Sequence, residues 1–111
     1  MSTVPFDQFA SLDIKIGKII SAEQVEGADR LVKLVVDVGE EAPRQIIAGI
    51  APFVADIGGL VGKHCPFVVN LEPKMLKGLE SQGMLLAVST PDGGFSLLVP
   101  ETVVPAGSKI R

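Results

Sequence analysis

Hydrophobic and polar positions alternate in short runs along the first half of the chain, which is the pattern of strands with one buried face. The run from Ile14 to Ala22 is rich in isoleucine with lysine and serine interleaved. Gly17 within it predicts a bend or bulge of the kind that curls a barrel. A second strand is expected from Leu31 to Val38 and a third from Arg44 to Ile50, with a turn at Glu26–Asp29 between the first two.

Glycine and proline recur at short intervals in the second half, so the expected elements there are short. They are a helix at Ala51–Leu60, a fourth strand at Cys65–Leu71, a long loop at Glu72–Gly83, a fifth strand at Met84–Ser89 and a further strand at Phe95–Val99. Pro66 implies that the fourth strand starts there or lies at an edge. A helical turn is expected within Pro5–Leu12. Five strands with a helix between the third and fourth predict an all-β OB-fold barrel, spanning about residues 12–90 of one domain.

The amino-acid composition excludes several classes of function. With 111 residues the chain is one domain, and its single cysteine and single histidine exclude an internal disulfide and a histidine-rich metal site. The first residues do not form a secretory signal, and no apolar run is long enough to span a membrane, so a cytoplasmic location is expected. No acid/base pair or catalytic triad is visible, so we expect neither an enzyme nor a cofactor.

The net charge of −3 and the absence of Trp and Tyr argue against a base-stacking nucleic-acid binder. The charge is unevenly distributed, however. Residues 1–62 hold five basic and nine acidic side chains, whereas residues 63–78 hold three basic ones and only Glu72 as an acid. Lys74 and Lys77 in the long loop supply point charges suited to phosphate. An ordinary solvated loop with scattered lysines explains the same pattern.

Several ordered motifs lie at matching spacing over about residues 6–111, and together they closely resemble the tRNA-binding domain family. The motifs are Asp13-Ile14-Lys15-Ile16-Gly17-Lys18-Ile19, Glu26-Gly27-Ala28-Asp29-Arg30-Leu31, Arg44-Gln45-Ile46-Ile47-Ala48-Gly49-Ile50 and Asn70-Leu71-Glu72-Pro73-Lys74, the last continuing to Ser81-Gln82-Gly83-Met84. The family includes free-standing dimeric tRNA-binding proteins, the C-terminal domain of methionyl-tRNA synthetases and the more distant CsaA chaperones.

The resemblance implies an OB-fold that binds the outer corner of tRNA by shape, with little sequence specificity. The family's RNA-binding positions fall on Lys33, Asn70, Lys74, Lys77, Ser81 and Met84. For Met84 the alternative is a core residue at the start of a strand. Gln82 is a further candidate, as a polar side chain of the same loop that can donate to phosphate or ribose oxygens. Lys15, Lys18 and Arg44 are further candidates, with a solvated strand face as the alternative. Lys77 stands where the family more often has arginine, which keeps the charge and loses the bidentate geometry.

The resemblance also implies a symmetric homodimer built through the C-terminal segment, about residues 91–111. Phe95–Val99 and Val103–Val104 supply apolar surface there, and the mean hydropathy of +0.43 is high for a soluble monomer. The function expected is tRNA binding, either alone or beside the catalytic domain of methionyl-tRNA synthetase. The alternative is a CsaA-like chaperone that binds unfolded polypeptide in the same groove.

Overall fold

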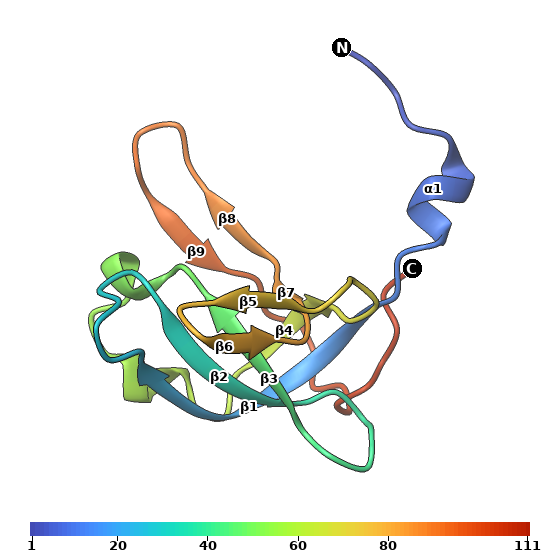
Figure 1. Cartoon of the computed structure of the whole chain (residues 1–111). Coiled ribbons are helices and arrows are strands. Elements are labelled where there is room, and N and C mark those ends of the chain that lie inside the picture. The colour runs from blue at the N-terminus through green and yellow to red at the C-terminus, as the bar shows by residue number, and fades with distance from the viewer.

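The computed structural model describes all residues, 1–111 (Figure 1). Its helical elements are α1 (Phe6–Ala10), η1 (Ala51–Phe53) and η2 (Ile57–Leu60), of which the last two are 3-10 turns. Its strands are β1 (Ile14–Gln24), β2 (Val32–Asp37), β3 (Arg44–Ala48), β4 (His64–Val68), β5 (Lys74–Leu76), β6 (Leu79–Ser81), β7 (Met84–Leu85), β8 (Ala87–Ser89) and β9 (Phe95–Leu97). No helix is both long enough and apolar enough to cross a membrane.

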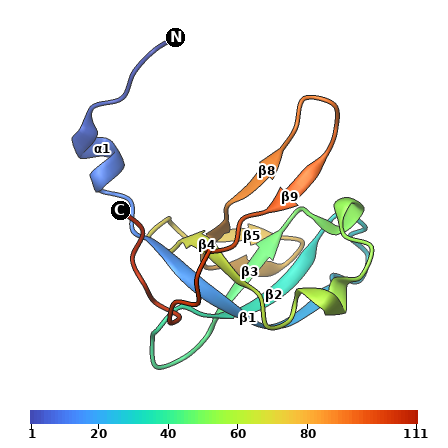
Figure 2. The same cartoon turned by 180° about the vertical axis from the view of Figure 1, so that it is seen from behind.

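Five strands form one antiparallel sheet in the order β3-β2-β1-β4-β7, which curls almost into a closed barrel (Figures 1 and 2). β1 makes this curl possible because it pairs with two neighbours in succession. Its first part, Ile14–Lys18, pairs with β4, and Lys18–Gln24 pairs with β2. The predicted OB-like barrel is therefore confirmed.

Alternation along the strands fills the barrel with apolar side chains. Val32, Leu34 and Val36 of β2 are fully buried, while the residues between them are only partly covered. Ile19 of β1 and Phe67 of β4 meet them in the same core. Burial of each such side chain contributes about 1.5–3 kcal/mol, so the barrel is held by its apolar face.

Gly17 has a different role from the predicted bulge. The register shift in β1 falls between Ile19 and Ser21, not at Gly17. At Gly17 the neighbours approach closely: a Cβ there would lie 2.5 Å from Cγ1 of Val36 and 2.9 Å from Cδ1 of Phe67. The position needs glycine because two core side chains occupy the space of a Cβ.

The expected helix at 51–60 is present only as the two 3-10 turns. Pro52 lies in the first turn of η1, and Val54 after it is extended, which interrupts any longer helix. Gly58 and Gly59 lie within η2, where glycine lowers helix stability. Pro66 also differs from expectation, because β4 lies between β1 and β7 and is not an edge strand. It is tolerated because β7 pairs only with Phe67 and Val68.

The region from 72 to 89 contains more regular structure than expected. The predicted loop holds the hairpin β5–β6, and the predicted fifth strand is divided into β7, which completes the barrel, and β8, which pairs with β9. The β8–β9 hairpin and the N-terminal arm with α1 both project from the same side of the barrel (Figures 1 and 2).

The chain after β9 returns to the barrel. Gly107 and Ile110 donate backbone hydrogen bonds to Ile16 and Ile14, and Lys15 forms a bridge with Lys109. These last residues thus extend the sheet beside β1, where β2 no longer pairs. The apolar surface expected of the tail is also partly used within the chain, because Phe95 stacks on Phe53 with ring centroids 5.2 Å apart.

Candidate nucleic-acid interface

The β5–β6 hairpin lies over β3 and presents its tip to solvent (Figure 1). Lys74 pairs with Ser81, and Leu76 pairs with Leu79. Lys77 and Gly78 form the two-residue turn with φ of 50° and 79°, both in the left-handed region. This is the tight hairpin turn in which glycine is favoured at the second position. Lys77 is consequently fixed at the tip, although its own conformation is unusual for a residue with a Cβ.

Ser81 and Gln82 attach the base of this hairpin to the free edge of β3. Ser81 is 5% exposed, and its Oγ accepts a hydrogen bond from the Ile47 amide (2.9 Å) and donates one to the Gly83 carbonyl (3.1 Å). The Gln82 side-chain oxygen accepts from the Gln45 amide at 3.0 Å. These side chains satisfy amides of β3 that no strand pairs, so they close the barrel.

Arg44 reinforces the same junction. Its guanidinium makes two hydrogen bonds to Glu40, both 2.8 Å, and donates to the carbonyls of Val69 and Gln82. The hydrogen bonds from Arg44 hold the pKa of Glu40 below its ordinary value, and Glu40 in turn raises the pKa of Arg44. The donors of Arg44 are therefore engaged inside the fold.

The side chain of Asn70 holds the segment between α1 and β1 in place. Its side-chain oxygen accepts from the Asp13 amide at 2.7 Å, and its amide nitrogen donates to the Ser11 carbonyl at 2.7 Å. Both polar atoms of the side chain are used at the junction between α1 and β1. Asn70 thus positions the residues that lead into the barrel.

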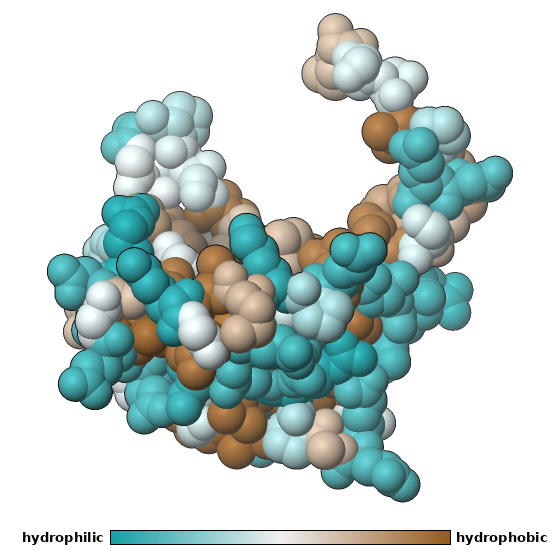
Figure 3. Space-filling model, in the orientation of Figure 1, coloured by the Kyte–Doolittle hydropathy of each residue, from teal (hydrophilic) through white to brown (hydrophobic).

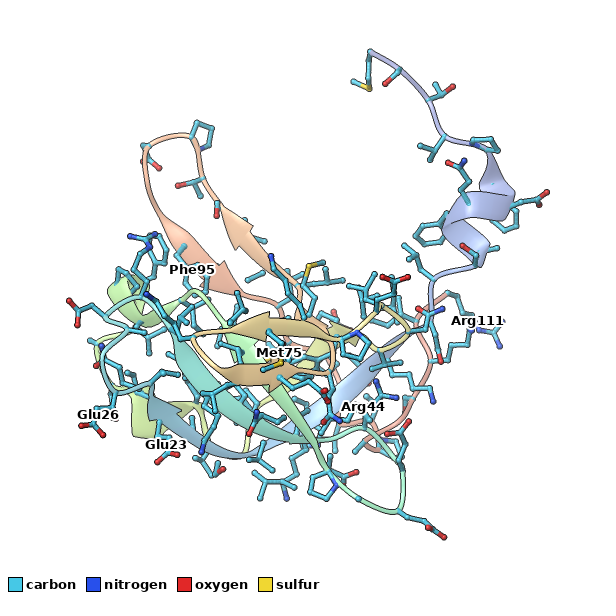
Figure 4. The ribbon with its side chains drawn as sticks, in the orientation of Figure 1. Glu23, Glu26, Arg44, Met75, Phe95 and Arg111 are labelled. Carbon is cyan, nitrogen blue, oxygen red and sulfur yellow. The ribbon has the colours of Figure 1, made fainter.

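The lysines of the hairpin have no such internal partners. Lys74 and Lys77 form no ion pair, whereas Lys33 on β2 is bound to Glu23 at 2.7 Å. Lys33 and Lys77 line one groove with Glu23 and Glu26, in a volume of about 400 Å³. The two acids lie at the end of β1 and in the turn that follows it (Figure 4). Lys33 and Lys77, two of the predicted residues, therefore lie in the same groove, where the negative charges of Glu23 and Glu26 offset theirs.

The other candidates lie elsewhere. Lys15 is 3.8 Å from Asp13, which also attracts Lys109 at 3.8 Å. Lys18 is exposed at the middle of β1, and Met84 is half-exposed in β7. None of these residues lines the groove of Lys33 and Lys77.

Comparison with known proteins shows the family to which the chain belongs. Residues 14–109 match the family model described as "Putative tRNA binding domain". The chain belongs to the tRNA-binding domain family. Within the family, a methionine–tRNA ligase of Methanothrix thermoacetophila is 47% identical over 108 residues, covering 97% of this chain and 16% of that protein. The chain thus spans about one sixth of the length of the curated relatives it matches.

Two solved structures share the fold of this chain over nearly its whole length. A MetRS-related protein from Pyrococcus horikoshii has a TM-score of 0.92 and 39% identity, with 100% of both chains covered. The chaperone CsaA of Bacillus anthracis has a TM-score of 0.88 and 30% identity, with 99% of this chain and 100% of that chain covered.

Sequence reasoning missed three groups beside the hairpin: the acid Glu23 that pairs with Lys33, the exposed Met75 on β5, and Arg30 in the turn before β2. Arg30 belongs to the motif Glu26–Leu31, one of those that resemble the family, and this membership could have marked it as a candidate binding residue. Nothing in the local sequence marks Met75, because its exposure depends on the hairpin that the sequence did not predict.

Proposed function

We propose that this chain is a non-catalytic tRNA-binding domain that recognises folded tRNA mainly through its phosphate backbone. The observation that carries the proposal is the pair Lys74 and Lys77, two cations without ion-pair partners on a hairpin fixed to the barrel, in a member of the tRNA-binding domain family. Fixed lysines bind phosphates without reading the sequence. Absence of Trp and Tyr fits recognition of an outline better than stacking on several bases.

The predicted contact residues then take two roles. Lys74, Lys77 and, once released from Glu23, Lys33 bind phosphates. Ser81, Gln82, Arg44 and Asn70 hold the binding hairpin and the start of the barrel in place, since their polar atoms are engaged internally. Lys15, Lys18 and Met84 extend the surface for a large ligand.

The domain acts without chemistry of its own. His64 precedes Cys65, and burial raises the pKa of the Cys65 thiol, so this pair is not suited to nucleophilic catalysis. Its relatives among methionine–tRNA ligases support a role beside a catalytic domain of that kind, in the cytoplasm, where it adds affinity for tRNA. Free-standing action is the other form of this proposal, because the solved MetRS-related chain of Pyrococcus horikoshii has the same fold over 100% of both chains.

A CsaA-like chaperone function is the second candidate, because the CsaA structure of Bacillus anthracis covers 99% of this chain. One titration separates the two functions. We expect the chain to retain mixed tRNA on filters at low salt, to lose affinity steeply between two salt concentrations, and to bind duplex RNA and DNA less tightly. Tight binding of an unfolded polypeptide with no retention of tRNA would establish the chaperone function instead.

We also propose that the chain forms a symmetric homodimer through its projecting arm and hairpin segments. Phe6 in α1 is 76% exposed and Val88 in β8 is 39% exposed, and no residue of α1 is buried. Figure 3 shows the hollow between the N-terminal arm and the β8–β9 hairpin, with apolar surface along it. A second copy related by a two-fold axis would cover the apolar residues of both segments.

Sedimentation equilibrium at micromolar concentration is expected to give twice the chain mass. Phe6→Asp is expected to shift the protein towards monomer, because it places a charge in the covered surface. Glu41→Gln, on the distant β2–β3 loop, is the control and should leave the mass unchanged. A monomeric mass for the unaltered chain would overturn the dimer.

A further inference from the structure

A second recess lies beside the groove of Lys33 and Lys77, on the other side of the hairpin tip. It has a volume of about 540 Å³ and is formed by the turn Gly27–Leu31 on one side and by Met75, Leu76 and Lys77 on the other. Its size is within the range of small-ligand sites. The two walls come from segments far apart in the sequence, so the recess exists only because the hairpin folds over the barrel.

The turn that forms one wall is rigid. The amides of Ala28 and Leu31 donate to the carbonyls of Val25 and Ala28, both at 3.1 Å. The carbonyl of Arg30 accepts from the Ala51 amide, and the carbonyl of Asp29 accepts from the Gln24 side chain at 3.0 Å. The side chains of Asp29 and Arg30 are therefore carried on a backbone that is bonded to its surroundings, and a ligand meets a preformed site.

The opposite wall offers an apolar face. Met75 is 62% exposed on β5 (Figure 4) and takes no part in the core of the barrel. Leu76 of the same wall and Leu31 of the facing turn are half-buried and line the same recess. A polarizable thioether packs well against a flat aromatic ring. This wall thus suits one planar, unsaturated group.

The charged residues that line the recess restrict the kind of ligand further. Arg30 and Lys77 are cations without an ion-pair partner, and Asp29, which is exposed, lines the same recess. A carboxylate repels phosphate, so it weakens a phosphate site unless it accepts hydrogen bonds from the ligand. Guanine is the base whose pairing edge presents two adjacent N–H donors to the two oxygens of a carboxylate.

We propose that this recess binds one unpaired guanine of the RNA. Met75 contacts the face of the base, the Asp29 carboxylate accepts from its pairing edge, and Arg30 and Lys77 hold the phosphates on either side. This inference rests on the proposed tRNA-binding function and adds to it one point of base recognition in an otherwise sequence-tolerant surface.

The test uses the full chain and guanosine 3′,5′-bisphosphate, a single guanine carrying both phosphates, with the adenosine compound as its partner. In two-dimensional amide NMR spectra, guanosine bisphosphate is expected to shift the signals of residues 27–31 and 75–77. Its affinity should exceed that of the adenosine compound by about tenfold, the discrimination expected of a bidentate base contact.

Two variants and two controls assign the effect. Asp29→Asn should remove most of the preference for guanine, and Met75→Ala should weaken both nucleotides by about fivefold while Met75→Leu retains binding. Asp56→Asn and Val61→Ala change an acid and an exposed apolar side chain outside the recess and should have no effect.

Mixed tRNA is titrated in parallel. If tRNA binds but neither nucleotide shifts these amides, or if Asp29→Asn leaves the preference intact, the guanine site is wrong and the proposed function stands. If tRNA fails to bind while the nucleotide still occupies the recess with a guanine preference, the proposed function is wrong and the site remains.

Discussion

Reversing the charges of Lys74 and Lys77 together, as Lys74→Glu with Lys77→Glu, is expected to weaken tRNA binding by about 100-fold at about 0.1 M salt. Both lysines lack ion-pair partners, and the hairpin that carries them is bonded to β3 through Ser81 and Gln82. Each phosphate contact that is lost reduces counterion release, so each single alanine variant should lower the slope of log K against log salt by about 0.9. Filter binding at a series of salt concentrations measures both quantities.

The same losses should appear with unrelated tRNAs, because phosphate contacts carry no base information. Lys63→Glu is the matched control, since Lys63 lies before β4 and outside the groove of Lys33 and Lys77. If Lys63→Glu weakens binding as much as Lys77→Glu, total charge and not the hairpin determines affinity. An effect confined to one tRNA sequence would equally contradict backbone recognition.

Glu23→Gln tests the same surface with the opposite sign. Glu23 is 2.7 Å from Lys33, so it neutralises one of the cations that line the groove. Removing its charge releases Lys33 and takes away one repulsion, and tRNA should then bind several-fold more tightly. An exposed ion pair is worth about 1 kcal/mol or less, so the chain should keep its stability. Unchanged or weaker binding would show that Lys33 does not face the RNA.

The barrel was predictable because its information is local. In β2, buried residues alternate with partly exposed ones, so the pattern indicates which face of the strand points into the core. The register to β1 and β3 follows from that face. The exception was the bend in β1. A glycine inside a strand often marks a bulge. Gly17 is needed for another reason, because Val36 and Phe67 occupy the space of a Cβ, and these two residues reach it only in the folded barrel.

The candidate site was less predictable, since its partners are distant in sequence. Ser81 looks like a ligand-binding hydroxyl in a loop, and it becomes a structural acceptor only when Ile47, 34 positions away, lies beside it. Arg44 looks like a free cation until Glu40 and the carbonyl of Val69 surround it. A polar residue in a binding motif can therefore serve the site by fixing its shape, and only its partners reveal which role it has.

The β5–β6 hairpin escaped prediction for a conformational reason. Its strands are three residues each, too short for a visible alternation, and its turn places Lys77 at φ 50°. Asparagine and aspartate followed by glycine are the usual signals of this turn, and lysine gives none. The paired strands are stabilised instead by their contact with β3, which no local pattern encodes.

Gly17→Ala is expected to lower the free energy of unfolding by about 3 kcal/mol, the upper part of the range for overpacking a core. The added methyl group would lie 2.5 Å from Cγ1 of Val36 and 2.9 Å from Cδ1 of Phe67. Both side chains are fully buried, so neither can turn away without displacing other core residues. For a domain of this size the melting temperature should fall by about 15 °C. Urea unfolding and thermal melting at one protein concentration measure the change.

A double-mutant cycle shows whether the clash with Val36 is the cause. Val36→Ala alone should destabilise the barrel through the cavity it leaves, but it also removes the methyl group that a Cβ at position 17 would strike. Adding Gly17→Ala to that variant should then cost less than in the original chain, by about 1 kcal/mol or more, because contacting residues are coupled. Gly49→Ala, where a Cβ meets no atom within 4 Å, is the control for losing a glycine. Strictly additive losses would instead place the strain on Phe67, and a stable Gly17→Ala protein would contradict the packing described for β1.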